Sequence, residues 1–523
     1  MHRGLCIPEI VYLIFSELRN LFPEPARDKT LAALAVTCRD FLNPALDTLW
    51  SEQTTLRHVL KCLPSHLWEQ SVGSEPWDEG QFYLRLLGPV NPEYWSRPLF
   101  YASRIQKLTL DCSDTMHDAF PDASVLEAIR AGLPRTYLCP NLHNLLWRSD
   151  EDAQLPFLNL FLSPNLDSAA IMVFGVSPPV PLDLSILSLK KLDFQFPGNS
   201  SLVCRSASSL VLRLNRVEVL SVTNLDRTAL QHLSQLETLR SLELFNVDAQ
   251  HIGRLSSVVP RRAPFPALRT LKLGDVSYSG VNKILRMLPP SCELDSFTAG
   301  IQFHDPAMFN EVYTLLVESL SHATLRMLDI GFFSRTQEFP PSFERNTDLT
   351  TLFAFQNLQF LRVYSPVLLG IDDALAWDMA RAWPNLTSLL LHSPLDDNLQ
   401  DTPVLTLSGL RAFAVHCPCL TNLRIDVDAS HVPADTITSS ESSLSVLDVA
   451  SSPIGDPDAV GSFVRQLFPH LEKIECQDWR WEHLGDMAPD RYLGWKQVEA
   501  SLPHARDAEG EQEEEEDWEL VDL

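Results

Sequence analysis

The sequence lacks several features that define common classes of protein. No stretch comes near the roughly 18 to 20 uninterrupted apolar residues that a membrane-spanning helix requires. Basic residues are few, with 41 Lys and Arg against 68 Asp and Glu, and the formal net charge is −27. Nucleic acids and anionic lipids both attract a basic surface, so we expect neither nucleic acid nor membrane among the partners.

A secretory signal and cysteine chemistry are also missing. The apolar run near the N-terminus, "CIPEIVYLIF" (6–15), is interrupted by Pro8 and Glu9, and no small-residue cleavage site follows it. The ten cysteines are scattered without a CxxC pair, and "CPC" (417–419) lacks the spacing of a zinc site. We therefore expect buried reduced thiols, no metal or other cofactor, and a cytoplasmic or nuclear location.

The motifs of common enzyme classes are absent as well. The chain contains no GxSxG, no HExxH and no glycine-rich phosphate loop. It has 15 histidines, but none stands with a cysteine or aspartate at a catalytic spacing. These absences predict a protein that positions other proteins and is not itself an enzyme.

What the sequence does contain is an internal repeat that runs through most of its length. Each copy has an apolar residue, two others, a second apolar residue, one other, and a third apolar residue. The clear copies are 105–110, 189–194, 217–222, 239–244, 268–273, 325–330, 358–363, 386–391, 420–425, 444–449 and 471–476. Weaker copies at 142–147, 166–171 and 294–299 bring the total to fourteen, at intervals of 22 to 37 residues, near the leucine-rich-repeat range.

The pattern within each copy predicts a short strand followed by a helix. Its last three positions alternate between the inside and the outside, as residues of a strand do, and its first apolar residue is buried where the chain turns into the strand. Helix-compatible stretches such as 280–289, 308–323 and 372–384 lie between copies. One such unit cannot bury its own apolar face, so the units are expected to stack into a curved α/β solenoid. A conventional α/β domain with unrelated strands is the alternative, which fourteen copies in one phase disfavour.

Ahead of the repeats, residues 5–50 predict three short helices. Pro8 suits the first turn of a helix, and the two prolines of "FPEPARD" (22–28) end it. A second helix follows, and a third is predicted to begin at "NPALDTLW", with Asn43 as its N-cap and Pro44 in the first helical position. Three helices of this size make a small core that gains stability by docking on a partner.

Both regions resemble one known family. The irregular repeat length and the form "CPxLxxLxL" resemble the leucine-rich repeats of F-box proteins, in particular the large fungal set. About fifty N-terminal residues resemble the F-box itself, with its Leu-Pro-x-Glu-(Ile/Leu) start, apolar-Phe pair, Val-Cys-(Arg/Lys) triplet and distal Trp. Ile7 replaces the usual leucine, and Glu9 directly follows the proline. The matching residues are Ile7-Pro8-Glu9-Ile10, Ile14-Phe15, Leu18, Thr37-Cys38-Arg39, Phe41 and Leu49-Trp50.

The resemblance implies a role in ubiquitin ligation. In that family the F-box binds the SKP adaptor of an SCF-type E3 ubiquitin ligase, and through it a cullin, while the repeats bind a protein substrate. The chain would then be a substrate-recognition subunit, with ubiquitin transfer left to the bound conjugating enzyme. The alternative is a leucine-rich-repeat interaction scaffold whose F-box-like region only caps the solenoid. The residues that the resemblance assigns to the adaptor contact are Pro8, Ile10, Phe15, Leu34, Cys38 and Trp50.

The strand face of the solenoid is the natural surface for a substrate. Outward positions of the repeats near 358–425 would together form an aromatic and basic patch on this acidic protein. Tyrosine and arginine are favoured as binding anchors, so we predict substrate binding there, although the same side chains could pack against each other as an ordinary mixed surface. The patch residues are Phe360, Arg362, Tyr364, His392 and Arg424.

The sequence thus divides into four regions. We predict an F-box-like helical domain at 1–60, a linker of helices and loops at 61–100, and the leucine-rich-repeat solenoid at 101–480. The last region, 481–523, ends in an acidic tail with ten Asp and Glu after Arg506. Like charges oppose compaction, so the tail is expected to be disordered, with "WELVDL" as a candidate docking motif.

Overall fold

The computed structural model describes sixteen segments of the 523-residue chain. The acidic tail and its WELVDL motif lie outside them, as does Cys6. The described segments are 7–21, 26–72, 82–113, 120–174, 189–196, 201–247, 249–252, 264–289, 292–303, 307–333, 348–365, 369–392, 403–434, 441–450, 452–476 and 490–502.

Helices and strands alternate along most of the described chain. The α-helices are α1 (Pro8–Leu21), α2 (Ala26–Ala35), α3 (Arg39–Trp50), α4 (Arg57–Leu60), α5 (Ser96–Ala102), α6 (Ala123–Gly132), α7 (Ser201–Val211), α8 (Arg227–Leu233), α9 (Ala249–Ile252), α10 (Tyr278–Leu285), α11 (Ala307–Ser319), α12 (Asp373–Ala382), α13 (Leu407–His416), α14 (Pro457–Leu467) and α15 (Asp490–Ala500). The 3-10 helices are η2 (Ser65–Leu67), η3 (Pro92–Trp95), η4 (Asp152–Leu160) and η5 (Leu349–Ala354).

The strands form one long parallel sheet and one hairpin. The sheet has 15 strands in sequence order, and the hairpin pairs β2 with β3. The strands are β1 (Glu52–Gln53), β2 (Trp68–Val72), β3 (Phe82–Leu86), β4 (Lys107–Asp111), β5 (Asn144–Ser149), β6 (Ser168–Val173), β7 (Lys191–Gln195), β8 (Val219–Thr223), β9 (Ser241–Phe245), β10 (Thr270–Ser277), β11 (Ser296–Gln302), β12 (Met327–Phe333), β13 (Phe360–Tyr364), β14 (Ser388–His392), β15 (Asn422–Arg424), β16 (Val446–Asp448) and β17 (Lys473–Glu475).

The predicted repeat is confirmed strand by strand. Each of the fourteen copies contains one strand, β4 to β17, and every strand begins at the third residue of its copy. The first apolar residue of each copy is buried, from Ile105 at 0% exposure to Leu471 at 2%. This regularity follows from one physical need, because each unit must bury the same apolar positions against its neighbours. The fold is an α/β solenoid of the leucine-rich-repeat type.

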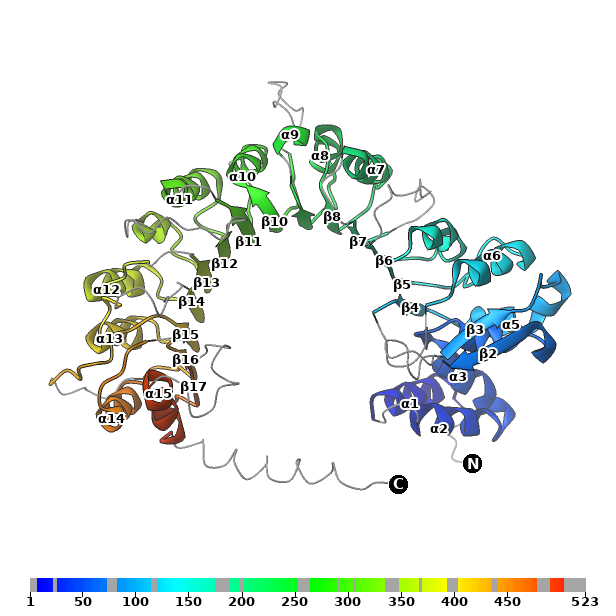
Figure 1. The fold of residues 1–523 in the computed structure, drawn as a ribbon, viewed down its shortest axis with the longest axis horizontal. Helices are drawn as coiled ribbons and strands as arrows, with labels where there is room; N and C mark the ends of the chain where they lie inside the picture. Colours follow the sequence, from blue (N-terminus) through cyan, green and yellow to red (C-terminus); the bar gives the residue numbers. More distant parts are fainter. Residues whose placement is uncertain are drawn as a thin grey trace. The chain divides into compact units, whose positions relative to one another are not determined.

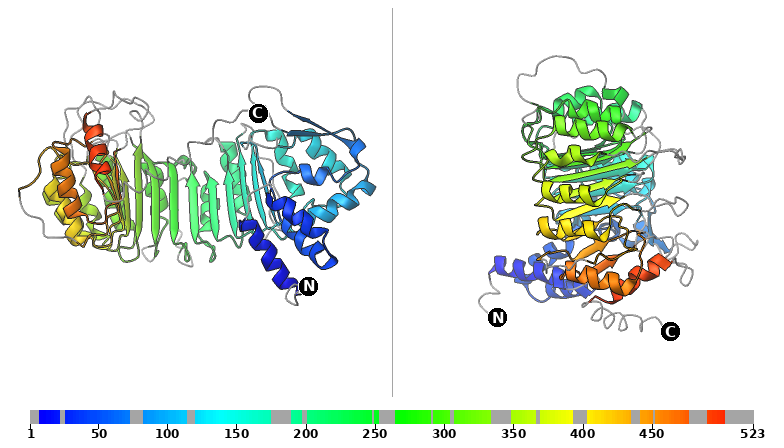
Figure 2. Two further views of the ribbon diagram at one scale, coloured as in Figure 1. Left: turned by 90° about the horizontal axis from the view of Figure 1, so that it is seen from below. Right: turned by 90° about the vertical axis from the view of Figure 1, so that its left-hand side faces the viewer.

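The described chain divides into two compact units. The first comprises Met1–Asn246 and Gln250–Arg254, and the second comprises Val247–Ala249 and Leu255–Leu523. Within the second unit, α10 to α14 lie on one side of the strands (Figure 1). We name the opposite side the open face, and alternate residues of each strand point toward it. Strands β10 to β14 lie side by side with their arrows parallel (Figure 2). Side chains in the same register therefore form rows across the open face, about 4.8 Å apart.

The three N-terminal helices share a small apolar core. Val11 and Phe15 from α1 pack with Leu31 and Ala35 from α2 and Ala45 from α3. Further apolar side chains are partly buried against these five, namely Leu18, Leu34, Phe41, Leu46 and Leu49. The predicted three-helix arrangement is therefore present, with its core on one side of α1.

The start of the third helix was predicted wrongly. The helix α3 begins at Arg39, with Cys38 as its N-cap, and Pro44 lies inside it. A proline inside a helix removes one backbone hydrogen bond, and for this reason the sequence predicted that the helix would begin later, with Pro44 in its first position. The additional first turn carries Phe41, whose ring packs edge-on against Phe15 with 5.4 Å between centroids. This core contact offsets the lost hydrogen bond, and Asn43 is left to accept a hydrogen bond from Arg104.

Two further elements were not predicted from the sequence. The region 61–100, expected to hold only helices and loops, also contains the antiparallel hairpin of β2 and β3. At the other end, α15 packs against α14 and the last strand, β17. Its Trp495 is 1% exposed and donates an indole N–H to the carbonyl of Ser452 at 2.9 Å. The helix α15 thus covers the end of the sheet, as repeat arrays require.

Candidate functional site: two interaction surfaces

Helix α1 exposes an apolar stripe on the side away from its core. The stripe consists of Ile7, Ile10, Leu13 and Ile14, whose exposed fractions are 45%, 38%, 65% and 41%. Single exposed apolar residues are ordinary, but a contiguous group marks a surface that another molecule covers. We name these four residues the α1 stripe.

The wider surface near α1 is also unusually apolar. Of the 19 large apolar side chains that are exposed among the described residues, eight belong to the short span from Ile7 to Leu42. An open depression of about 590 Å³ lies beside the stripe, lined in part by Tyr12 and Leu13 of α1 and Thr48 of α3. The stripe and the depression together form a candidate docking surface.

The structure distributes the six predicted adaptor residues between surface and core. Pro8 and Ile10 are exposed on α1. Phe15 is 3% exposed, and Leu34 is partly buried against the same core. Phe15 and Leu34 therefore shape the helical core beneath the surface. The predicted adaptor contact did not include the stripe residues Leu13 and Ile14. Both belong to the apolar run at 6–15, which could have indicated them.

The remaining two predicted adaptor residues lie away from the stripe. Cys38 is partly buried at the N-terminus of α3. Trp50 ends α3, and its ring stacks on Tyr101 of α5 with 4.6 Å between centroids and 24° between planes. Trp50 thus joins the helical core to the chain that enters the repeats.

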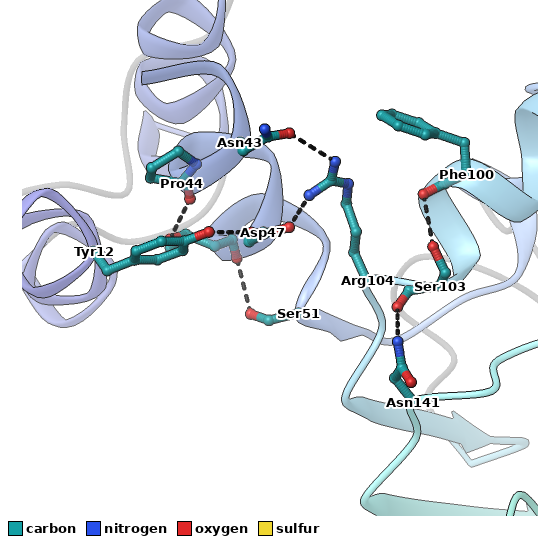
Figure 3. Close-up of polar contacts among 10 residues, drawn as sticks. Tyr12, Asn43, Pro44, Asp47, Ser51, Phe100, Ser103, Arg104 and Asn141 are labelled. Atoms are coloured by element: carbon teal, nitrogen blue, oxygen red, sulfur yellow. Dashed lines mark hydrogen bonds and ion pairs between the residues drawn. The ribbon is translucent and has the colours of Figure 1, made fainter. Parts of the chain in front are cut away.

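A partly buried ion pair reinforces this joint (Figure 3). Arg104, which immediately precedes the first repeat copy, pairs with Asp47 of α3 and donates to the amide oxygen of Asn43 at 3.0 Å. The other carboxylate oxygen of Asp47 accepts a hydrogen bond from the hydroxyl of Tyr12 on α1. Burial lowers the pKa of Arg104, whose side chain is 13% exposed. One carboxylate thus links α1 to the start of the repeats.

Backbone pairing continues the joint into the sheet. The chain leaves α3 through Ser51, whose carbonyl accepts the N–H groups of Gln106 and Lys107 at 2.8 Å. The two residues of β1 then pair with β4 in parallel register, Glu52 with Lys107. The strand β1, which follows directly on α3, therefore occupies the first edge of the sheet, as part of a cap does.

The second candidate surface is the open face over β12 to β16. The register places Arg362 beside Leu390 and then Arg424, while Tyr364 lies beside His392. Phe360 occupies the row before them on β13. The five predicted substrate residues therefore share one face of three adjacent strands, and the rings of Tyr364 and His392 are 5.8 Å apart.

The charge of this surface differs from the predicted basic patch. Arg362 makes a two-pronged pair with Asp329 of β12, at 2.8 Å from Nε and 2.5 Å from Nη2. Arg424 pairs with Asp448 of β16 at 2.5 Å. Each arginine is thus paired with a carboxylate one strand away, so the charges of both arginines are compensated, while the Arg362 side chain stays 46% exposed.

The histidine of the patch is uncharged at neutral pH. Burial, with the nearby guanidinium groups of Arg424 and Arg362, lowers the pKa of His392 to about 4. Burial also raises the pKa of Asp448, and Arg424 opposes that rise. The surface therefore combines aromatic rings with paired charges, and Tyr364 and Arg362 remain about half exposed on it.

The Arg362–Asp329 pair should matter for stability. We expect Arg362→Ala to lower the free energy of unfolding by about 1 to 3 kcal/mol, because Asp329, 9% exposed, would keep a buried carboxylate without its partner. The matched control is Lys473→Ala on the same sheet. Its pair with Glu475 is more exposed, at 58% and 28%, and should change stability by about 0.5 kcal/mol or less. Urea unfolding measures both variants, and equal losses would contradict the expectation.

Two of the buried thiols, Cys139 and Cys417, are poor candidates for chemistry, whereas Cys419 of the CPC sequence is exposed. Burial raises the pKa of Cys139 and of Cys417 to about 12, which keeps both protonated at neutral pH. Cys417, from the CPC sequence, donates to the carbonyls of Ala380 and Trp383. Within the described segments, no three His, Cys, Asp or Glu side chains come together as metal ligands. No helix in those segments has the length and apolar character to cross a bilayer.

Comparison with known protein families and with curated proteins identified no related protein. No protein-family model matches the sequence, and a search of curated proteins found no match. The geometry of the two surfaces therefore carries the functional argument.

Proposed function

We propose that this protein is a substrate-recognition subunit of an SCF-type E3 ubiquitin ligase. The helices α1 to α3 act as an F-box that holds a SKP adaptor, and through it a cullin. The open face of the repeats holds a protein substrate, and the chain is not itself an enzyme. A cytoplasmic or nuclear location agrees with the buried thiols.

The observation that carries this proposal is the α1 stripe. A helix that only packed on its own core would be apolar on one side, with Val11 and Phe15 inward and polar residues outward. Instead α1 presents Ile10, Leu13 and Ile14 to solvent. These side chains are 38% to 65% exposed, so covering each of them contributes roughly 0.5 to 2 kcal/mol, and together they can support a specific interface.

The joint at Arg104 and Trp50 supports the same function. A ligase must hold its substrate in a defined place relative to the adaptor, and this requires helices that do not move freely on the repeats. The contacts of Arg104 with Asp47, and of Trp50 with Tyr101, connect α3 to the chain entering the repeats.

The cap is the second candidate role, favoured by the pairing of β1 with β4. In that case the protein is a leucine-rich-repeat interaction scaffold, and the helices serve to close the sheet. A cap accounts for Trp50, Asp47 and Arg104, whereas it gives no reason for the exposed stripe.

The test is binding to a purified SKP adaptor. We expect the wild-type chain to co-elute with the adaptor and the double variant Ile10→Asp/Ile14→Asp to bind at least about 30-fold more weakly, equivalent to about 2 kcal/mol. Both side chains are exposed, so the helices should stay folded, which circular dichroism checks.

The matched control is Leu212→Asp/Val415→Asp. These residues are 40% and 61% exposed and lie outside the N-terminal helices, so adaptor binding should be unchanged. A folded wild-type chain that does not bind the adaptor would reject the ligase role and leave the scaffold. Equal losses in the two double variants would show that the stripe is not the contact.

A further inference from the structure

The open face contains two glycines beside the predicted substrate residues, and we name the open space over one of them, Gly331, the recess. In one register row, Gly300 of β11 lies beside Gly331 of β12, followed by Tyr364 and His392. A Cβ atom built on Gly331 would meet only the Cβ of Tyr364, at 3.9 Å. The space above Gly331 is therefore open, while Tyr364, 50% exposed, stands directly beside it.

Aromatic and planar groups surround this space. A Cβ built on Gly300 would lie 3.0 Å from the ring of Phe333, so this ring leans over β11 and forms the wall opposite Tyr364. Arg362 lies two residues before Tyr364 on β13, with its guanidinium plane fixed by the two-pronged bond to Asp329. Because the carboxylate occupies the edge of the guanidinium, its flat faces are left for stacking.

The charges on and around the recess limit which kind of substrate side chain can bind there. An acidic or phosphorylated segment would have to displace Asp329, which is 9% exposed and bound through two hydrogen bonds. The net charge of −27 also repels acidic segments at long range. A basic segment would find both carboxylates of this surface already occupied, Asp329 by Arg362 and Asp448 by Arg424. An uncharged side chain meets none of these penalties.

We propose that the recess over Gly331 receives an aromatic side chain from an extended segment of the protein substrate. The ring would lie between Phe333 and Tyr364 and stack on Arg362. Tyr364 stands on β13, about 4.8 Å to one side of β12, and the ring of Phe333 leans over β11 on the other side. The space therefore has the width of one side chain, and an extended segment can place a single side chain there. This inference rests on the proposed function, because it assumes that the open face is the substrate surface.

The test uses a phage-displayed library of random linear peptides, about a dozen residues long, selected on the full chain. Enriched peptides are then synthesised and their dissociation constants measured by fluorescence anisotropy. We expect peptides that share one Trp, Tyr or Phe, and replacing that residue by Ser should weaken binding at least about tenfold. The variant Gly331→Leu, which fills the recess, should cause a similar loss.

Two further variants separate filling of the recess from damage to the fold. Tyr364→Ala removes a wall of the recess at an exposed position and should also weaken binding. The matched control is Ala170→Leu, which also replaces a small residue by leucine, but on β6 in the first unit. Ala170 directly precedes the third apolar residue of its repeat copy, and Arg362 has the same position in the copy that contains β13. This control should leave the peptides bound as tightly as before.

Several outcomes would overturn the inference. These are enrichment of acidic or basic peptides without a shared aromatic residue, peptides that bind Gly331→Leu as well as wild type, or no enrichment at all. Adaptor binding, measured on the same wild-type preparation, keeps the two proposals distinguishable. Adaptor binding without aromatic peptides rejects only the recess, and aromatic peptides without adaptor binding reject only the ligase role.

Discussion

Replacing Phe15 by alanine is expected to unfold helices α1 to α3 while the repeats stay folded. Phe15 is 3% exposed and packs edge-on against Phe41 at the centre of the helical core. Truncating a buried phenylalanine costs about 3 to 5 kcal/mol. A core built from about fifty residues has little more stability than that, so the loss should exceed what the helices can tolerate.

Hydrogen exchange followed by mass spectrometry measures this effect region by region. Amides of residues 7–21 and 26–50 should lose protection in Phe15→Ala, while those of β10 to β14 should keep it. The matched control is Ile14→Ala, one residue earlier on the same helix but 41% exposed, which should change stability by about 0.5 kcal/mol or less. Unchanged protection of α1 in Phe15→Ala would contradict the described core.

This expectation also determines which variants can test adaptor binding. A Phe15 variant would lose the adaptor whether the residue touches it or only supports the helices. Changes in the α1 stripe avoid this ambiguity, because Ile10 and Ile14 are exposed. The F-box resemblance named Phe15 and Ile10 together, and only their burial separates the two roles.

The second large effect is expected at the other end of the sheet. Trp495→Ala should cost about 3 to 5 kcal/mol, because Trp495 is 1% exposed and its indole N–H bonds to Ser452. Loss of α15 would uncover β17, whose outer edge then offers unpaired backbone groups to another chain. We therefore expect a lower melting temperature together with self-association.

Thermal unfolding and light scattering after size-exclusion chromatography measure the two consequences. The matched control is Leu493→Ala on the same helix, where the side chain is 50% exposed and should contribute little. A Trp495→Ala protein that melts like wild type and remains monomeric would show that α15 is not the cap of the sheet.

The repeats could be predicted from the sequence because one requirement recurs fourteen times. The spacing of apolar residues located every strand from β4 to β17 and the side of the strand that each residue occupies. Elements that occur once were harder to find. The strand β1 has only two residues, Glu52 and Gln53, neither of them apolar, so its pairing with β4 has no local signal.

For the two candidate surfaces, too, part of the arrangement could be predicted from the sequence and part could not. The apolar run of α1 was evident in the sequence, and so was the alignment of Arg362, Tyr364, His392 and Arg424. Which side of α1 faces the core depends on α2 and α3, which pack on Val11 and Phe15. The carboxylate that holds Arg362 lies 33 residues away, at the same position of the preceding repeat copy. The repeat therefore places the two residues on neighbouring strands, but only the structure shows that their side chains pair.

The sequence by itself determined the repeat architecture, the number and phase of its strands, and the apolar character of the first helix. These depend on local periodicity, which each segment carries within itself. Only the tertiary structure decided which apolar residues stay exposed on α1. It also decided that carboxylates pair with the arginines of the open face and that a recess opens over Gly331. Each of these depends on which side chains from distant parts of the chain become neighbours, and packing across strands and helices determines that.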